Sequence, residues 1–412
     1  MVKSSNPWLR SLMRAGKKQQ RANARALQAL LTPPKPPKPP KPPKPPKPPK
    51  LKAASSSPAG ASPPKSRPAT QRKTTPASPV SLLAAPFALA RPPEVATVRR
   101  QPLERPGAAP GKWLTGAHLW QPEAGQSARM SYWLYLPDRP PGRQGWPLVV
   151  MLHGCDQSAT LFAQGTRMNQ HADKAGCAVL YPQQSMAHHP HRCWHWYERA
   201  TQQGGGEAAA ITALVHKMLD SYPLDRARVY LAGLSAGAGM AHILALNFPH
   251  LFAAVGLHSG PLFGAGHSTI GALAVMRHGA SALGERAIAE MRARRAPMPP
   301  VPPMPTILIQ GAEDTVVHPA NQDQLERQVM TLNQMTRGSR VEVTQHPGNA
   351  RCHPHVIRDV VVDESPLLRV VRVAELKHAW SGGDPQLSFN SGAGPDASKM
   401  MLAFFKLHRR SA

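Results

Sequence analysis

The segment at 229–246 constrains the fold of this chain more than any other. Residues 229–232 form an apolar Val-Tyr-Leu-Ala run, residues 233–237 read Gly-Leu-Ser-Ala-Gly, and a helical stretch of small residues follows. A strand, a tight turn and a helix in this order expose a serine above the end of a sheet, at the N-terminus of the helix. Glycines flank the serine because a side chain would clash in so sharp a bend. The segment therefore predicts that Ser235 is a nucleophile.

The alternation of apolar runs and helical patterns continues over the body of the chain. Most runs are continuous Val, Leu, Ile and Ala stretches, which is typical of strands covered on both faces. Strand, helix and strand in succession predict an α/β fold with a mainly parallel, doubly wound sheet and helices on both faces. We expect strands at 132–136, 148–152, 178–181, 229–232, 253–257, 306–309 and 370–376, and helices near 158–175, 206–221, 236–248, 281–294, 319–335 and 396–408.

A serine hydroxyl needs a base to take its proton, and the base needs an acid to orient it. In this class of fold the chain order is serine, then acid, then histidine. The buried-strand pattern at 306–311 is followed directly by Ala312, Glu313 and Asp314. A carboxylate at this place points into the crevice where doubly wound sheets bind ligands. Loop geometry alone leaves both residues open as the acid.

The histidine is expected in a loop after the last strand. His378 meets this condition, because it follows the last predicted strand and precedes the last predicted helix. The sequence holds 19 histidines, and the downstream rivals are His318, His346, His353 and His355. Its position in the chain is what favours His378.

The oxyanion that forms during acyl transfer needs preorganised N–H donors. The amide of Ala236, directly after the serine, is one expected donor. The other should come from the loop after an early strand, where His-Gly-Cys follows the apolar run at 148–152. The backbone N–H of Cys155 is therefore the second candidate.

A loop near residue 190 is rich in histidine, cysteine and tryptophan. Trp194 and Trp196 are candidate substrate-binding residues, because their rings could form a contact surface for an acyl chain, but packing in the core is an equal alternative.

The nearby Gly-Gly-Gly-Glu run at 204–207 lacks the Gly-Lys-Ser/Thr ending of a phosphate loop. No metal site is expected, since no closed tetrahedral pattern matches the spacing of His188, His189, His191, Cys193 and His195.

Six motifs of the body form a combination that is more specific than any one of them. They are Pro-Leu-Val-Val-Met-Leu-His-Gly-Cys-Asp-Gln-Ser at 147–158, Arg-Cys-Trp-His-Trp at 192–196, Gly-Gly-Gly-Glu at 204–207, Ala-Gly-Leu-Ser-Ala-Gly at 232–237, Gly-Leu-His-Ser-Gly at 256–260 and His-Ala-Trp-Ser-Gly-Gly at 378–383. Together they resemble the poly(3-hydroxybutyrate) depolymerase family of esterases, over about residues 113–408.

This resemblance implies an α/β-hydrolase fold with a triad of Ser235, Asp314 and His378, and it prefers Asp314 to its neighbour as the acid. It implies hydrolysis of ester bonds in poly- or oligo(3-hydroxybutyrate), with feruloyl and acetylxylan esterases as related alternatives. No metal or organic cofactor is implied. The family's paired cysteines imply a disulfide between Cys155 and Cys193, which requires an oxidising compartment.

Residues 1–111 differ in composition from the rest of the chain. They hold 22 of the 50 Lys and Arg residues but only two acidic ones, whereas residues 112–412 hold 28 basic and 21 acidic residues. The formal net charge of +27 therefore belongs mainly to a tail rather than to a body that binds nucleic acid. Six Pro-Pro-Lys units at 33–50 predict an extended polyproline II rod within a largely disordered tail. We expect residues 112–412 to form the catalytic domain.

Ahead of this rod, residues 7–31 have the pattern of a basic amphipathic helix. Such a helix would let residues 1–52 bind a polymer granule or another anionic surface, and the alternative is a weakly structured, solvated tail. No apolar signal core follows the basic start, and the apolar run at 81–90 is too short to span a bilayer. The location therefore stays open between extracellular, which the resemblance implies, and cytoplasmic or granule-associated.

One segment interrupts the rhythm of the body. Residues 261–305 form an insertion rich in Gly, Met, Arg and Pro. It is interpreted either as a mobile cap over the active site or as a plain surface excursion, since long insertions add little closure entropy.

Overall fold

The structure is a computed structural model that describes residues 109–120, 128–295, 301–335 and 339–410. The amphipathic helix expected at 7–31, the Pro-Pro-Lys rod at 33–50 and the surface-binding role of residues 1–52 lie outside these ranges. The expected catalytic domain at 112–412 lies almost wholly within them.

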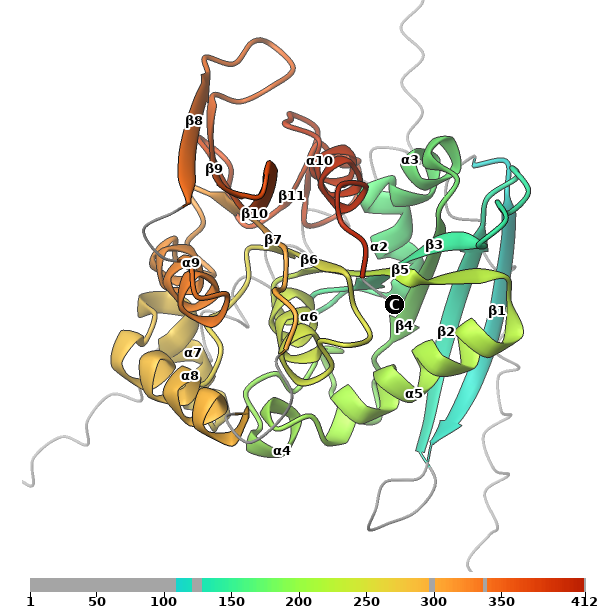
Figure 1. The fold of residues 1–412 in the computed structure, drawn as a ribbon, viewed down its shortest axis with the longest axis horizontal. Helices are drawn as coiled ribbons and strands as arrows, with labels where there is room; N and C mark the ends of the chain where they lie inside the picture. The colour runs from blue at the N-terminus through green and yellow to red at the C-terminus, as the bar shows by residue number, and fades with distance from the viewer. Residues whose placement is uncertain (1–108, 121–127, 296–300, 336–338, 411–412) are drawn as a thin grey trace, which may run out of the picture. The chain divides into compact units, whose positions relative to one another are not determined.

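In the described residues, a ten-stranded sheet forms the centre of the body (Figure 1). Six neighbouring strands pair in parallel, in the order β4-β3-β5-β6-β7-β10. Both β6 and β7 are buried along their whole length, which explains their continuous apolar sequences. Parallel pairing brings the carboxyl ends of all six strands to one edge of the sheet. The strands span Ala178–Gln183 (β4), Trp146–Leu152 (β3), Leu224–Leu234 (β5), Ala254–His258 (β6), Thr306–Gly311 (β7) and Ser365–Val373 (β10).

Antiparallel strands complete the sheet on both sides. Strands β1 (Lys112–Trp120) and β2 (Ala128–Leu136) lie beyond β4, and β9 (His355–Val362) and β8 (Arg340–His346) lie beyond β10. The outer strand β8 is exposed over its first six residues, so its sequence has no buried-strand run. Two short strands, β11 (Trp380–Ser381) and β12 (Asn390–Ser391), pair with each other in a separate sheet.

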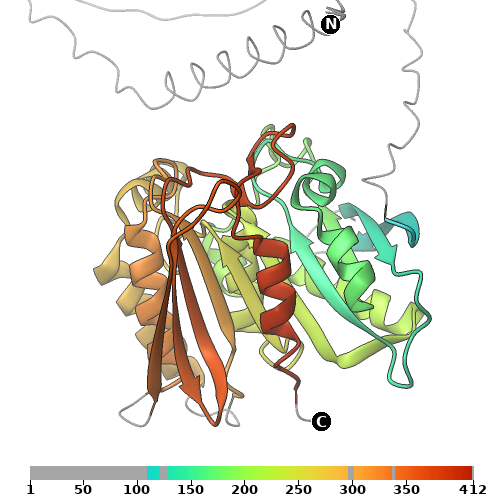
Figure 2. The ribbon, with the colours of Figure 1, turned by 90° about the horizontal axis from the view of Figure 1, so that it is seen from above.

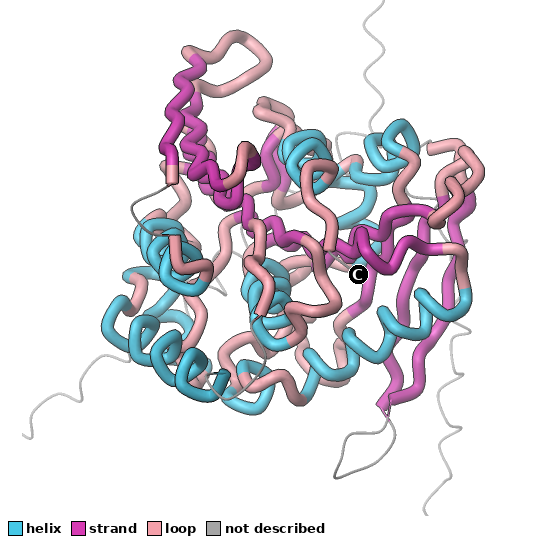
Figure 3. Tube along the Cα trace, in the orientation of Figure 1, coloured by secondary structure: helices cyan, strands magenta, loops and turns pink. Residues whose placement is uncertain are grey.

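Helices cover both faces of the large sheet (Figures 1 and 3). On one face, α2 (Ala159–Thr166), α3 (Met168–Ala175) and α10 (Ala397–Phe405) share an apolar cluster with the strands. Figure 2 shows the red helix α10 lying along this face. On the other face, α5 (Gly206–Ser221), α6 (Ala236–Asn247) and α9 (Ala320–Leu332) bury apolar side chains in a second cluster, and the short α4 (Arg199–Gln202) precedes α5. The doubly wound architecture predicted from the sequence is confirmed. Among the helices in the described ranges, none is long and apolar enough to cross a membrane.

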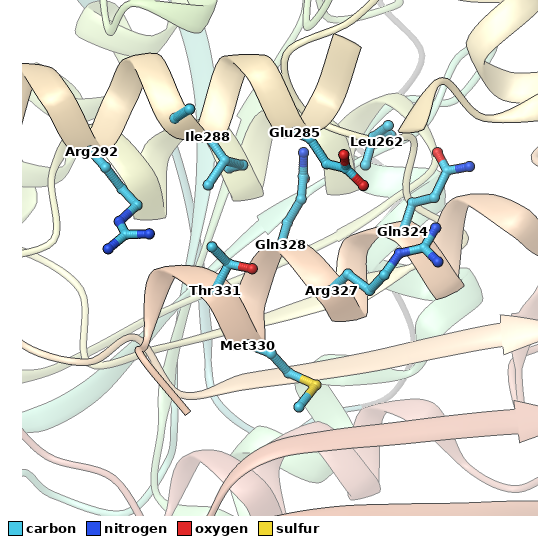
Figure 4. A pocket seen from close by; sticks show the side chains of 10 residues that line it. Leu262, Glu285, Ile288, Arg292, Gln324, Arg327, Gln328, Met330 and Thr331 are labelled. Carbon is cyan, nitrogen blue, oxygen red and sulfur yellow. The ribbon is translucent and has the colours of Figure 1, made fainter. Parts of the chain in front are cut away.

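In its described residues, the insertion at 261–305 contains two helices, α7 (Thr269–His278) and α8 (Ser281–Arg295), of which the sequence pattern indicates only the second. Both lie beside α9 (Figure 1) and contribute to the same apolar cluster as α9. A cavity of about 390 Å³ lies between α8 and α9, with Arg292 and Arg327 among its lining residues (Figure 4). Ser235, Asp314 and His378 do not line this cavity. Movement of the insertion as a cap stays a prediction.

Candidate active site

Ser235 occupies the sharp turn between β5 and α6, where the sequence predicts it. Its backbone has φ 57° and ψ −121°, a conformation that costs about 1–3 kcal/mol for a residue with a side chain and that clusters at functional sites. The glycines on both sides are required by packing. A Cβ at Gly233 would lie 2.4 Å from the Gly237 backbone, and a Cβ at Gly237 would lie 2.0 Å from the Leu152 carbonyl oxygen. The turn therefore holds the serine at the carboxyl edge of the sheet.

Asp314 and His378 are in direct contact. Asp314 follows β7 and His378 follows the neighbouring strand β10, and Asp314 Oδ2 accepts a hydrogen bond from His378 Nδ1 at 2.8 Å. The other carboxylate oxygen, Oδ1, accepts the backbone N–H groups of Val316 and Val317, each at 2.9 Å. Asp314 as a whole is 1% exposed. Burial raises the pKa of Asp314, but the hydrogen bond and charge of His378 and the Val317 amide outweigh it, so the pKa lies below its usual value.

The alternatives that the sequence left open make other contacts. Glu313 is exposed. His318 Nδ1 accepts the Ala320 N–H, and His353 pairs with Glu375. The rings of His346 and His355 stack on each other between β8 and β9. In the described part of the chain, none of these four histidines bonds to Asp314.

His258, which sequence reasoning did not single out, bridges the serine turn and the histidine loop. Its backbone oxygen accepts the Ser235 N–H at 2.9 Å, and its Nε2 accepts the Ser381 N–H at 3.2 Å. The buried ring stacks on Trp380, and burial together with the charge of His378 lowers its pKa to about 3. Within the described residues, Ser235 Oγ makes no hydrogen bond to His378, and such bonds commonly tighten only when substrate binds. The signal that marks His258 is its place in the Gly-Leu-His-Ser-Gly motif.

The candidate oxyanion donors lie on two segments beside the serine. Ala236 is the first residue of α6, and the first N–H groups of a helix have no partner within the helix. The second segment is the loop after β3, which carries Cys155. A Cβ at Gly154 would lie 3.5 Å from Ser235 Cβ, so this loop lies next to the serine. The Gly154 N–H donates to Gln157 Oε1 at 2.8 Å, which fixes the turn that precedes the Cys155 amide.

A disulfide joins Cys155 to Cys193, with an S–S distance of 2.08 Å. It attaches the candidate oxyanion loop to the histidine-rich loop after β4. Two histidines of that loop are engaged with carboxylates, since His191 contacts Asp156 and His195 contacts Glu207. Over the described ranges, no group of three or more His, Cys, Asp or Glu side chains is placed to hold a metal ion.

The structure corrects the expectation that Trp194 and Trp196 form a substrate surface. Trp194 is 0% exposed and Trp196 is 4% exposed, and both belong to the large apolar cluster. Trp194 Nε1 donates to the carbonyl oxygen of His153 at 3.0 Å. The rings pack in the core behind the candidate oxyanion loop, because burial of their large apolar surface stabilises the fold. Of the two alternatives for these residues, packing in the core therefore holds.

Residues 130–347 match the family described as esterase PHB depolymerase, over more than half of the chain. The chain belongs to this esterase family. It is 32% identical over 188 residues to poly(3-hydroxyalkanoate) depolymerase C of Paucimonas lemoignei, which is 44% of each chain. It is 34% identical over 134 residues to feruloyl esterase B of Thermothelomyces thermophilus, which is 32% of this chain and 44% of that one. The chain thus matches less than half the length of either relative.

The fold agrees with this membership of the PHB depolymerase esterases. The structure is similar to acetyl xylan esterase from Aspergillus awamori, with a TM-score of 0.51, 18% identity, and coverage of 68% of this chain and 94% of that one. The body therefore has the α/β-hydrolase fold.

Proposed function

We propose that the protein hydrolyses ester bonds of poly- or oligo(3-hydroxybutyrate) through a triad of Ser235, His378 and Asp314. The observation that carries this proposal is the bond from His378 Nδ1 to Asp314 Oδ2, at the same sheet edge as the strained turn of Ser235. The carboxylate fixes the imidazole with Nδ1 as its donor, which leaves Nε2 to accept a proton.

In the proposed reaction, Ser235 Oγ attacks the ester carbonyl while His378 Nε2 takes its proton. Asp314 orients the imidazolium and stabilises its charge. The backbone N–H groups of Ala236 and Cys155 donate hydrogen bonds that stabilise the oxyanion. His378 then protonates the leaving alcohol, and it activates the water that releases the acyl group from the serine.

The choice of a hydroxyalkanoate polyester as substrate is supported by the similarity to poly(3-hydroxyalkanoate) depolymerase C. A second candidate is a feruloyl ester, because feruloyl esterase B is similar at 34% identity over a shorter stretch. Turnover of poly(3-hydroxybutyrate), its soluble oligomers, and feruloyl and acetyl esters by the wild-type protein separates the two. Preference for the oligomers supports the first proposal, and turnover of aromatic esters alone overturns it. Ser235→Ala should be inactive on every substrate of the panel.

A further inference from the structure

Glu207 lies at the centre of a hydrogen-bond cluster outside the proposed triad. It belongs to the Gly-Gly-Gly-Glu run at 204–207 and to the first turn of α5, where a negative charge is favoured by the helix dipole. Its side chain is 13% exposed. Its Oε2 accepts the His195 N–H at 2.8 Å, and its Oε1 accepts His195 Nδ1–H at 2.6 Å and the Gln184 side-chain amide. The carboxylate thus holds one residue by its backbone and its ring at once.

Gln184 connects Glu207 to the candidate oxyanion loop by hydrogen bonds. Its amide Nε2 donates to the Cys193 carbonyl oxygen at 3.0 Å as well as to Glu207, and its Oε1 accepts the Ser185 N–H. Both hydrogens of the amide are therefore used, and the orientation of the side chain is fixed. The backbone N–H of Gln184 donates to His153 Nε2 at 3.1 Å.

His153 can accept this bond because its Nε2 carries no proton. The ring is fully buried, and burial lowers its pKa to about 4, so the imidazole is neutral at neutral pH. Its Nδ1 lies 2.8 Å from the Gly154 carbonyl oxygen, which can only accept. The proton is therefore on Nδ1, and Nε2 is free to accept from Gln184. The buried ring thus binds the carbonyl oxygen of Gly154, the residue before Cys155.

The segment 193–195 connects the same cluster to the loop from its other side. Cys193 forms the disulfide to Cys155, and Trp194 Nε1 donates to the His153 carbonyl oxygen. His195 is bound twice by Glu207. Every residue of this segment thus contacts either the candidate oxyanion loop or the carboxylate behind it.

We infer that Glu207 is a positioning residue that holds the oxyanion loop at 153–155 in its catalytic geometry, through Gln184 and the segment 193–195. The inference rests on the proposed serine mechanism, because the loop has this role only if Cys155 N–H stabilises an oxyanion. Preorganised donors act on the transition state and not on the bound substrate. Loss of Glu207 should therefore lower kcat and leave KM almost unchanged.

The test compares Glu207→Gln with Glu198→Gln, using p-nitrophenyl butyrate and a trifluoromethyl ketone that forms a tetrahedral adduct on the serine. Glu198 is exposed, lies in the same loop, and contacts the cluster through its backbone N–H, which the His195 carbonyl oxygen accepts. The change Glu198→Gln keeps this backbone bond and removes the same charge. Glu207→Gln should lower kcat by about 10- to 100-fold, because a displaced oxyanion donor costs less than the loss of about 10²- to 10³-fold that follows its complete removal. The ketone should bind more weakly by the same factor as kcat/KM falls, whereas Glu198→Gln should match the wild type.

Gln184→Met keeps the volume of a buried side chain and removes its amide, so it decides the matter if Glu207→Gln does not fold. A kcat decrease with unchanged KM and weaker ketone binding in either folded variant supports the inference. Values of kcat equal to the Glu198→Gln control, or a change confined to KM, overturn it. If the wild-type protein hydrolyses no ester of the panel, the proposed function itself fails. An active wild type with inactive Ser235→Ala and unaffected Glu207→Gln refutes this inference alone.

Discussion

His378 Nδ1 and Asp314 Oδ2 lie 2.8 Å apart, although 64 residues separate them in the sequence. The sheet creates this contact, because β7 and β10 are parallel neighbours and their loops leave the same edge. The β8–β9 hairpin accounts for much of the intervening chain, and it extends the sheet on the far side of β10. A large insertion between acid and base is therefore accommodated without separating them.

The change Asp314→Asn tests the proposed acid of the triad. The amide can donate to the histidine and favours the wrong tautomer, so kcat should fall about 10⁴-fold, as in serine proteases that carry the equivalent change. The exposed neighbour provides the control, and Glu313→Gln should keep the wild-type kcat. Steady-state kinetics on a p-nitrophenyl ester measures both. A large loss in Glu313→Gln with an active Asp314→Asn would instead identify Glu313 as the acid.

The disulfide is tested by the double variant Cys155→Ser with Cys193→Ser. The bridge closes a loop of 38 residues, so its removal should lower the free energy of unfolding by about 2–4 kcal/mol. The kcat should fall as well, because the loop that carries the Cys155 amide loses a covalent attachment. Urea denaturation and ester turnover measure the two effects, with the free thiol variant Cys352→Ser as the control. Unchanged stability and kcat in the double variant would show that the bridge does not hold this loop.

The buried histidines should make the protein acid-sensitive. Burial lowers the pKa of His242 to about 4, well below the value of 6.5 for an unfolded chain, and its Nδ1 has no hydrogen-bond partner among the described residues. Between these two values the unfolded chain binds more protons than the folded one, so stability is full above pH 6.5 and is lost as the pH falls toward 4. His153 and His258 add to the effect in the same direction.

A chemical-denaturation series from pH 7.5 to pH 5 measures this loss. His242→Gln should reduce the loss between these pH values by about 1–2 kcal/mol, because the variant has no proton to take up on unfolding. The exposed His188→Gln is the control for the loss of an imidazole as such. A pH dependence in His242→Gln as steep as that of the wild type would show that this histidine is not the source.

The parallel core of the fold could be predicted from the sequence because burial on both faces leaves continuous apolar runs. The runs at 148–152 and 306–309 lie inside β3 and β7, and the helix expected at 206–221 coincides with α5. Strands β8 and β9 were missed because their residues are largely exposed or half-buried, and pairing rather than composition makes them strands. Helix α7 was missed in a segment rich in glycine, where propensity favours a loop.

Some residues of the candidate site could likewise be predicted from the sequence, and others could not. Ser235 and Asp314 lie where local patterns predict them, since each directly follows a strand. The sequence leaves the position of Trp194 open between surface and core, because sequence alone does not tell a buried aromatic ring from an exposed one. The role inferred for Glu207 has no local signal, because its contacts come from residues 12 and 23 positions away in the sequence.

Covalent labelling tests most directly whether Ser235 is the nucleophile. A fluorophosphonate reacts with a serine that a neighbouring base activates. Mass spectrometry of the labelled protein should find one adduct, on Ser235 in the peptide that contains residues 233–237, with esterase activity lost in proportion. Ser235→Ala should take up no label. Full inhibition with the adduct on another serine, and with Ser235 unmodified, would contradict the account.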